Sequence, residues 1–191
     1  MKKIIAFSGS NSSGSINQAL IYHVAELIDC DGVHIEILDL HDMEVPIYSI
    51  DLEQQSGIPA PIIELKEKLS EADAFIIASP EHNGALPAFF KNIIDWLSRI
   101  DQKIFNHRKV VLLSASPGAK GGESNLTHLA TLLPHWGGKV IGKLSIGRFD
   151  QFIESERVKL PNEYCEKLQR LLFKLCSSIL IEIDELNYQT N

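Results

Sequence analysis

The sequence is poor in cysteine: Cys30, Cys165 and Cys176 are the three in 191 residues, without CxxC spacing. An odd number without that spacing provides neither a disulfide framework nor a zinc site, and it favours a reducing compartment, the cytoplasm. Long apolar runs are also missing, since none approaches the roughly 18 residues of a membrane span. Met-Lys-Lys is followed by too short an apolar stretch for a signal-peptide core, so we expect no membrane association.

An excess of positive charge is missing as well. The chain carries 18 Lys and Arg against 25 Asp and Glu, a net charge of −7. Binding to nucleic acid would gain nothing from counterion release, so we expect no nucleic-acid partner. With 45% hydrophobic and 23% charged residues, the composition is that of a globular protein, and the length suits one domain over residues 1–191.

Strand-like and helix-like stretches alternate along the chain. Short apolar runs predict strands at 3–7, 74–78 and 110–113, and alternation of apolar and polar residues predicts one at 33–38. We also predict a strand at 139–146. Apolar residues at helical spacing predict helices at 16–27, 62–69, 89–100, 124–133 and 162–181. Residues 41–60 contain two prolines and little periodicity, so we predict a long loop there, a lid or a contact with a neighbouring subunit.

This alternation predicts an α/β fold, a flavodoxin-like three-layer sandwich with a five-stranded parallel sheet in the order 2-1-3-4-5. Ligands of such sheets bind beyond the carboxyl ends of the strands, where the strand order reverses. Three unusual stretches begin there, which we call loop one (residues 8–15), loop two (79–87) and loop three (114–122). Their coincidence with the expected ligand edge predicts a binding site.

Loop one is rich in glycine and serine and enters a predicted helix, as phosphate-binding loops do. The Walker pattern fails because Ser15-Ile16 stand where Lys-Ser/Thr is needed, and the GxGxxG pattern is absent. A monophosphate held by amides and hydroxyls remains, or these residues only cap the helix. The residues concerned are Ser10, Ser12, Ser15 and Asn17.

Loops two and three are suited to a flat ligand. In loop two, Pro80 stiffens the turn and Gly84 lets the backbone approach closely, although the loop could also be an ordinary solvated turn. Loop three, Ser-Ala-Ser-Pro-Gly-Ala-Lys-Gly-Gly, has little bulk apart from Lys120. It could lie against a ring or serve only as a flexible connection.

These residues together resemble the NADPH-dependent FMN reductase family, which includes quinone, azo-dye and chromate reductases. The resemblance covers residues 3–146, and its most specific part is Pro80-Glu81-His82-Asn83-Gly84 followed by Lys91-Asn92-Ile93-Ile94-Asp95-Trp96. It implies FMN as cofactor, NADPH or NADH as reductant, a small-molecule electron acceptor and a homodimer or homotetramer. The helix at 91–99 would lie at the subunit interface; Trp96, Phe89 and Phe90 would belong to that interface or to the core.

The resemblance also implies the site residues. Ser10, Ser15, Ile16 and Asn17 would hold the FMN phosphate. The isoalloxazine would be wrapped, mostly by backbone amides, and flanked by residues of loops two and three: Pro80, Glu81, His82, Asn83, Gly84, Ser116 and Gly118. No side chain is needed as an acid or base, and no metal is implied.

The sequence departs from the family pattern at two positions. Ser12 replaces a common arginine, which removes a bidentate cation from the phosphate, and His82 replaces the usual tyrosine, which changes the stacking surface. A flavin-binding electron carrier or sensor without efficient NAD(P)H turnover remains the alternative function. A hydrolase is less consistent with the sequence, because neither a G-x-S-x-G elbow nor a His–Asp pair is evident.

Overall fold

In the computed structural model, residues 1–154 and 157–189 are described, the side chains as far as Ile181. The central feature is a five-stranded parallel sheet with the order β2-β1-β3-β4-β5, which confirms the predicted topology. Its strands are β1 (Lys2–Ser8), β2 (Val33–Leu38), β3 (Ala74–Ala78), β4 (Lys109–Ala115) and β5 (Lys139–Ile146).

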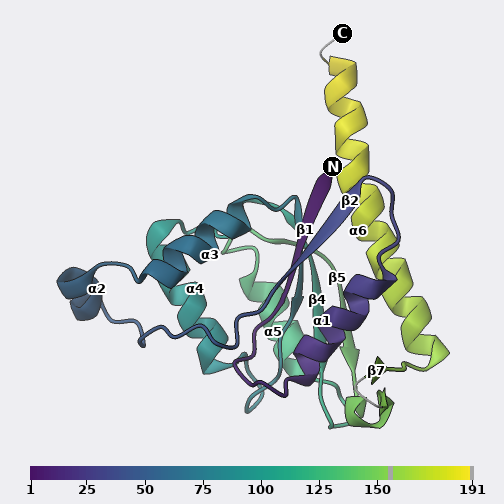
Figure 1. The fold of residues 1–191 in the computed structure, drawn as a ribbon, viewed down its shortest axis with the longest axis horizontal. Helices are drawn as coiled ribbons and strands as arrows, with labels where there is room; N and C mark the ends of the chain where they lie inside the picture. Colours follow the sequence, from purple (N-terminus) through teal and green to yellow (C-terminus); the bar gives the residue numbers. More distant parts are fainter. Residues whose placement is uncertain (155–156, 190–191) are drawn as a thin grey trace.

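Helices cover both faces of this sheet (Figure 1). The inner strands β1, β3 and β4 are mainly apolar, and successive side chains point to opposite faces: Ile5 and Phe7 lie in one core cluster, Ile4 and Ala6 in the other. One face packs against α3 (Ala60–Ser70), α4 (Ala88–Ile100) and α5 (Glu123–Leu132), and the other against α1 (Ile16–Leu27) and α6 (Asn162–Gln189).

The segment that joins β2 to α3 corrects one prediction. Residues 41–60 were expected to be a loop, but they contain the helix α2 (Ile50–Ser56), which lies away from the sheet (Figure 1). Ser49 caps α2 by accepting from Leu52 N at 3.2 Å, and Gly57 ends it at φ +74°, a conformation that suits glycine. We call residues 41–59 the arm.

The arm is held on α4. The Trp96 indole N–H and the Asn92 amide both donate to the Pro46 carbonyl, at 2.8 and 3.0 Å, and Tyr48 N donates to Asn92 Oδ1 at 2.8 Å. The rings of Tyr48 and Trp96 meet edge to face, 5.0 Å apart. Trp96 and Phe90 are buried in the core while Phe89 packs at its edge, so the core interpretation of these aromatic residues is confirmed for the first two.

The chain after β5 holds elements that the sequence did not indicate. They are a 3-10 helix, η1 (Phe149–Phe152), and a short antiparallel pair, β6 (Ile153–Glu154) and β7 (Arg157–Val158). The final helix is also longer than the predicted 162–181.

Candidate functional site

The three loops meet at the carboxyl edge of the sheet, because the ends of β1, β3 and β4 lie level with one another in the register. They enclose a cavity of about 250 Å³. Its lining residues are Ser10, Ser12, Gly14, Ser15, Ile16, Asn17, Pro80, Glu81, His82, Ala115, Ser116 and Pro117. Nine of the twelve cofactor residues predicted from the sequence are among them; the other three, Asn83, Gly84 and Gly118, are close along the chain but do not line it.

Loop one places hydroxyl groups around the N-terminus of α1. Ser15 is the N-cap and accepts from Gln18 N at 3.2 Å, and Ser10 Oγ accepts from Ser12 N at 3.2 Å. Each hydroxyl therefore uses an oxygen lone pair within the protein and keeps its hydrogen for an external acceptor. Together with the positive end of the helix dipole, these donors suit an anion.

Gly9 brings loop one close to α4. A Cβ atom at this position would lie 2.9 Å from the ring of Phe90, which is itself buried. No larger residue fits without moving that ring, so this glycine is required by packing rather than by its own backbone conformation.

The side chain of Asn17 has a role that the sequence did not indicate. Its Nδ2 donates to the Ala115 carbonyl and its Oδ1 accepts from Ala115 N, both at 2.9 Å, and the residue is 1% exposed. Both polar atoms thus tie the first turn of α1 to the end of β4. The main-chain N–H is then the donor that Asn17 has left for a ligand.

Loop two is a tight hairpin. His82 N donates to the Ala85 carbonyl at 2.9 Å and Ala85 N donates back to His82 O at 3.1 Å. Asn83 and Gly84 both have positive φ, 52° and 80°, as the central residues of a type I′ turn require. His82, Asn83 and Gly84 are exposed, so the turn presents its backbone and the imidazole at the mouth of the site.

Asn125, at the start of α5, holds the first residues of loop two. Its Nδ2 donates to Ser79 O at 3.1 Å, Ser79 Oγ at 2.9 Å and Pro80 O at 2.9 Å, while its main-chain N donates to Glu81 Oε2 at 2.9 Å. Sequence reasoning missed this residue because one polar side chain within an apolar helical pattern carries no periodic signal.

Loop three is closely packed at its glycines. Gly121 and Gly122 have φ of 63° and 79°, where side chains cause strain. A Cβ on Gly121 would lie 2.5 Å from the Ile146 carbonyl carbon, and one on Gly122 would collide with Ser114 Oγ. The loop therefore packs directly against the ends of β4 and β5.

Neutral donors dominate the electrostatics of the site. Glu81 is the charged residue among those that line the cavity, and its carboxylate is occupied by the N-terminus of α5. No lysine or arginine lines it; Lys120 and Arg148, the cations of the adjoining loops, are exposed. An anion bound at the N-terminus of α1 would meet hydroxyl and amide groups rather than a cation.

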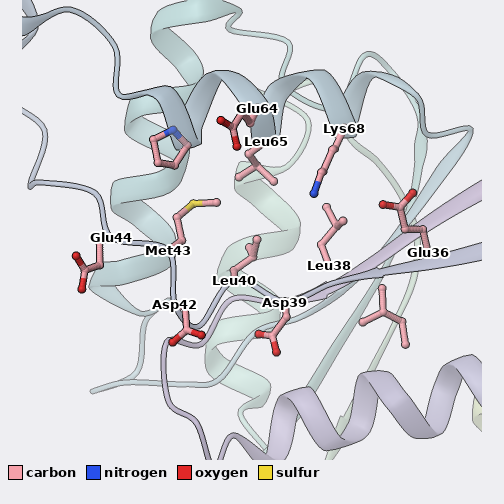
Figure 2. A pocket seen from close by; sticks show the side chains of 12 residues that line it. Glu36, Leu38, Asp39, Leu40, Asp42, Met43, Glu44, Glu64, Leu65 and Lys68 are labelled. Carbon is pink, nitrogen blue, oxygen red and sulfur yellow. The ribbon is translucent and has the colours of Figure 1, made fainter.

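A larger cavity, about 550 Å³, lies elsewhere, between the end of β2, the start of the arm at residues 42–44, and α3. Figure 2 shows Leu38, Leu40, Met43 and Leu65 lining it, with carboxylates around them. Its ionisable lining residues are five acids and one base: Glu36, Asp39, Asp42, Glu44, Glu64 and Lys68. This excess of negative charge disfavours an anionic cofactor, so size alone does not identify the functional cavity.

Neither a metal centre nor a membrane span is found in the described part of the chain. No group of three or more His, Cys, Asp or Glu residues there is placed to hold a metal ion. None of the helices described combines the length and the apolar character that crossing a bilayer takes.

Comparison with known proteins identifies relatives of this chain. The family model for NADPH-dependent FMN reductases matches residues 2–151. The chain is 29% identical over 142 residues to a quinone reductase of Escherichia coli, covering 74% of each protein. It is 33% identical over 131 residues to an NAD(P)H-dependent FMN reductase of Pseudomonas aeruginosa, covering 69% of each.

The solved structures agree in fold. FerB, a flavoenzyme NAD(P)H:(acceptor) oxidoreductase from Paracoccus denitrificans, superimposes with a TM-score of 0.75 at 23% identity, over 94% of this chain and 97% of that one. The chain belongs to the NADPH-dependent FMN reductase family. It is therefore an oxidoreductase with FMN and NAD(P)H as its cofactors.

Proposed function

We propose that this member of the NADPH-dependent FMN reductase family binds FMN in the cavity between the three loops and catalyses the reduction of a small acceptor, first of all a quinone, by NAD(P)H. The observation that carries the proposal is the convergence of loops one, two and three on one cavity at the ligand edge of the sheet. The acceptor class is supported by the quinone reductase of Escherichia coli; azo compounds and free flavins are the other candidates to screen.

The residues around the cavity fit FMN. The phosphate would be bound at the N-terminus of α1 by the hydroxyls of Ser10, Ser12 and Ser15 and by the main-chain N–H groups of Ile16 and Asn17. Gly14 also lines the cavity beside these groups, and no protein atom lies within 4 Å of where its Cβ would be. The donors are neutral hydrogen-bonding groups around a positive helix end, which is the chemistry that a phosphate requires.

The isoalloxazine would lie along loop two, between Pro80 and the turn at Asn83-Gly84, with Glu81 and His82 beside it. Ser116 and Gly118 of loop three would flank the approach of the nicotinamide. When bound, FMN supplies hydride acceptance from NAD(P)H and electron release to the acceptor. The chain binds and orients the reactants, and N–H groups near the ring stabilise the negative charge that reduction brings.

The test is a visible spectrum. The purified protein is mixed with FMN, desalted, made anaerobic and treated with NADPH or NADH. We expect the yellow colour to remain and then to bleach, and to return when a quinone is added. Colour that remains but does not bleach with either nucleotide would favour an electron carrier or sensor. If no flavin stays with the protein at micromolar concentration, the cavity is not an FMN site.

We further propose a homodimer, or a homotetramer built from dimers, with the arm at the subunit interface. The arm is clamped to α4, yet Ile47 is 84% exposed and Ile50 57% exposed. Large apolar side chains on a fixed backbone favour a protein partner. Ile47→Glu should therefore lower the mass measured by light scattering, whereas the matched control Ile181→Glu on α6 should not. An unchanged mass for Ile47→Glu would place the interface elsewhere.

We also propose that residues 1–191 are one domain in the cytoplasm. The two core clusters share one sheet, which supports a single cooperative unit. The three cysteines are free thiols, which supports a reducing compartment.

A further inference from the structure

Asn125 is a buried polar residue whose side-chain hydrogen bonds all go to residues outside its own helix. It is 0% exposed, it lies in the first turn of α5, and its Nδ2 donates outward to three oxygen atoms of Ser79 and Pro80. Leu126 and Leu129 on the same helix are core residues. An apolar residue at 125 would continue that surface, so an amide here is explained by what it holds.

The contact with Pro80 fixes the orientation of a peptide group. The bond between Pro80 and Glu81 is trans, because the described chain contains no cis peptide. In a trans peptide the C=O and the N–H point in opposite directions. Since Asn125 turns the Pro80 carbonyl toward α5, the N–H of Glu81 must point away from α5.

Two other contacts prevent this peptide from turning over. The Glu81 carboxylate accepts from Asn125 N, and the Ser79 carbonyl is bound by the same amide as the Pro80 carbonyl. Loop two is therefore attached to one turn of α5 on both sides of the Pro80–Glu81 bond. Pro80 and Glu81 also line the cavity.

We propose that Asn125 is a positioning residue for the flavin: it holds the Pro80 carbonyl on α5 so that the Glu81 N–H is presented to bound FMN. This inference rests on the proposed function, because it needs FMN in the cavity. A fixed N–H donor beside the ring favours the reduced, more negative form without reorganisation. The polar edge of the isoalloxazine, with its carbonyl oxygens and ring nitrogens, is the chemical group that such a donor recognises.

The proposal explains why asparagine suits this position better than aspartate or alanine does. Aspartate has the same shape but no N–H, so it would face the Ser79 and Pro80 carbonyls with a negative charge. Alanine would leave those buried acceptors without a donor. Both changes free the peptide to turn over while the lining residues remain in place.

The experiment compares Asn125→Asp and Asn125→Ala with the control Thr131→Ala on the same helix. Thr131 lies outside the three loops, and its hydroxyl donates to the His128 carbonyl within α5 at 2.7 Å. We expect both Asn125 variants to bind FMN about ten-fold more weakly, the effect of one positioned hydrogen bond, and to show a more negative flavin midpoint potential. The control should keep the wild-type affinity and potential.

A merely structural role would lower the melting temperature of the variants and leave the potential of the bound flavin unchanged, and that result would overturn the proposal. A measurement on the wild type covers the case in which the variants do not fold. The amide resonance of Glu81 should shift and gain exchange protection when FMN is added. If other loop-two amides respond and Glu81 does not, the proposal is wrong. If the wild type binds no FMN at all, the proposed function itself fails.

Discussion

The three loops and the arm are two irregular regions that the protein holds in place by different means. The loops are tied by the amides of Asn17 and Asn125, both essentially inaccessible to water, and by the close packing of Gly9, Gly121 and Gly122. The arm is held in part by exposed groups: Arg99, 43% exposed, pairs with Glu53 at 2.9 Å and lies 5.8 Å from the ring of Tyr48.

This difference has a physical consequence. Salt does not screen buried hydrogen bonds between neutral groups. When one partner is removed, the other buried group has neither a protein partner nor water to bond with, so each such hydrogen bond is costly to remove. Exposed ion pairs are screened and contribute little. We therefore expect the loops to be fixed and intolerant of change, and the arm to be adjustable.

The largest effect is expected from Gly121→Ala in loop three. The new Cβ would meet the backbone of Ile146 at 2.5 Å, and φ of 63° is unfavourable for alanine. We expect a loss of about 3 kcal/mol in unfolding free energy and a fall of about 6–12 °C in melting temperature. Gly14→Ala, with open space at its Cβ and no positive φ, is the control and should melt like the wild type. Equal melting of both variants would contradict the packing account of loop three.

A smaller effect is expected when the arm loses its amide clamp. Asn92→Ala removes the acceptor for Tyr48 N and one donor to Pro46 O, a change of about 1–2 kcal/mol in local opening. Hydrogen exchange of the Tyr48 amide should become about ten-fold faster or more, while the amides of loop two exchange as before. Ser98→Ala, on the same helix, is the control. Faster exchange in both regions would mean that the arm and the loops open together.

The contribution of Arg99, which contacts Glu53 and Tyr48 of the arm, should weaken as the salt concentration rises. In Arg99→Ala, the cation that stacks on Tyr48 and binds Glu53 is lost. We expect Tyr48 amide exchange to rise slightly at low salt and to match the wild type in 1 M salt, where the Debye length is about 3 Å. A difference that persists undiminished in 1 M salt would contradict the proposed screening.

The smallest predicted effect concerns His41, the first residue of the arm, and it depends on pH. The hydrogen bond to Asp39 raises the pKa of His41, and the charges of Asp39 and Asp42 raise it further against some desolvation. Because the folded pKa lies above the unfolded value of about 6.5, this stabilisation is complete below pH 6.5 and is lost as the pH rises through the folded pKa. An NMR titration of the imidazole should show the raised pKa, and Asp39→Asn should lower it. The same titration curve in both proteins would contradict this cause.

The sequence predicted the parts of the fold that rest on repeated apolar positions. The strand β3 is a continuous apolar run, β1 and β4 have apolar centres, and β2 alternates apolar and polar residues. These patterns explain why the strands could be derived before the structure. The α2 helix was missed because it buries none of its residues, so no apolar period marks it, although Ser49 and Gly57 are its capping residues. The β6–β7 pair is too short to have a period.

The sequence predicted which loops form the candidate site, but not which side chains within it contact one another. Serine and glycine at strand ends indicated which segments converge. The sequence could not show that the Asn17 side chain is engaged by Ala115, or that Asn125 holds loop two, because both contacts join residues far apart in the chain: 98 positions for Asn17, and 46 for Asn125 and Ser79. Such pairs are set by the packing of α1 and α5 on the sheet.

The most direct test of the central claim, that the N-terminus of α1 and the hydroxyls of loop one bind the FMN phosphate, is a titration of the wild type with FMN and with riboflavin. Riboflavin has the same ring and lacks the phosphate. We predict that FMN binds at least ten-fold more tightly, the effect of one charge-assisted hydrogen bond, and that Ser15→Ala narrows this difference. Equal affinity for FMN and riboflavin in the wild type would contradict the claim.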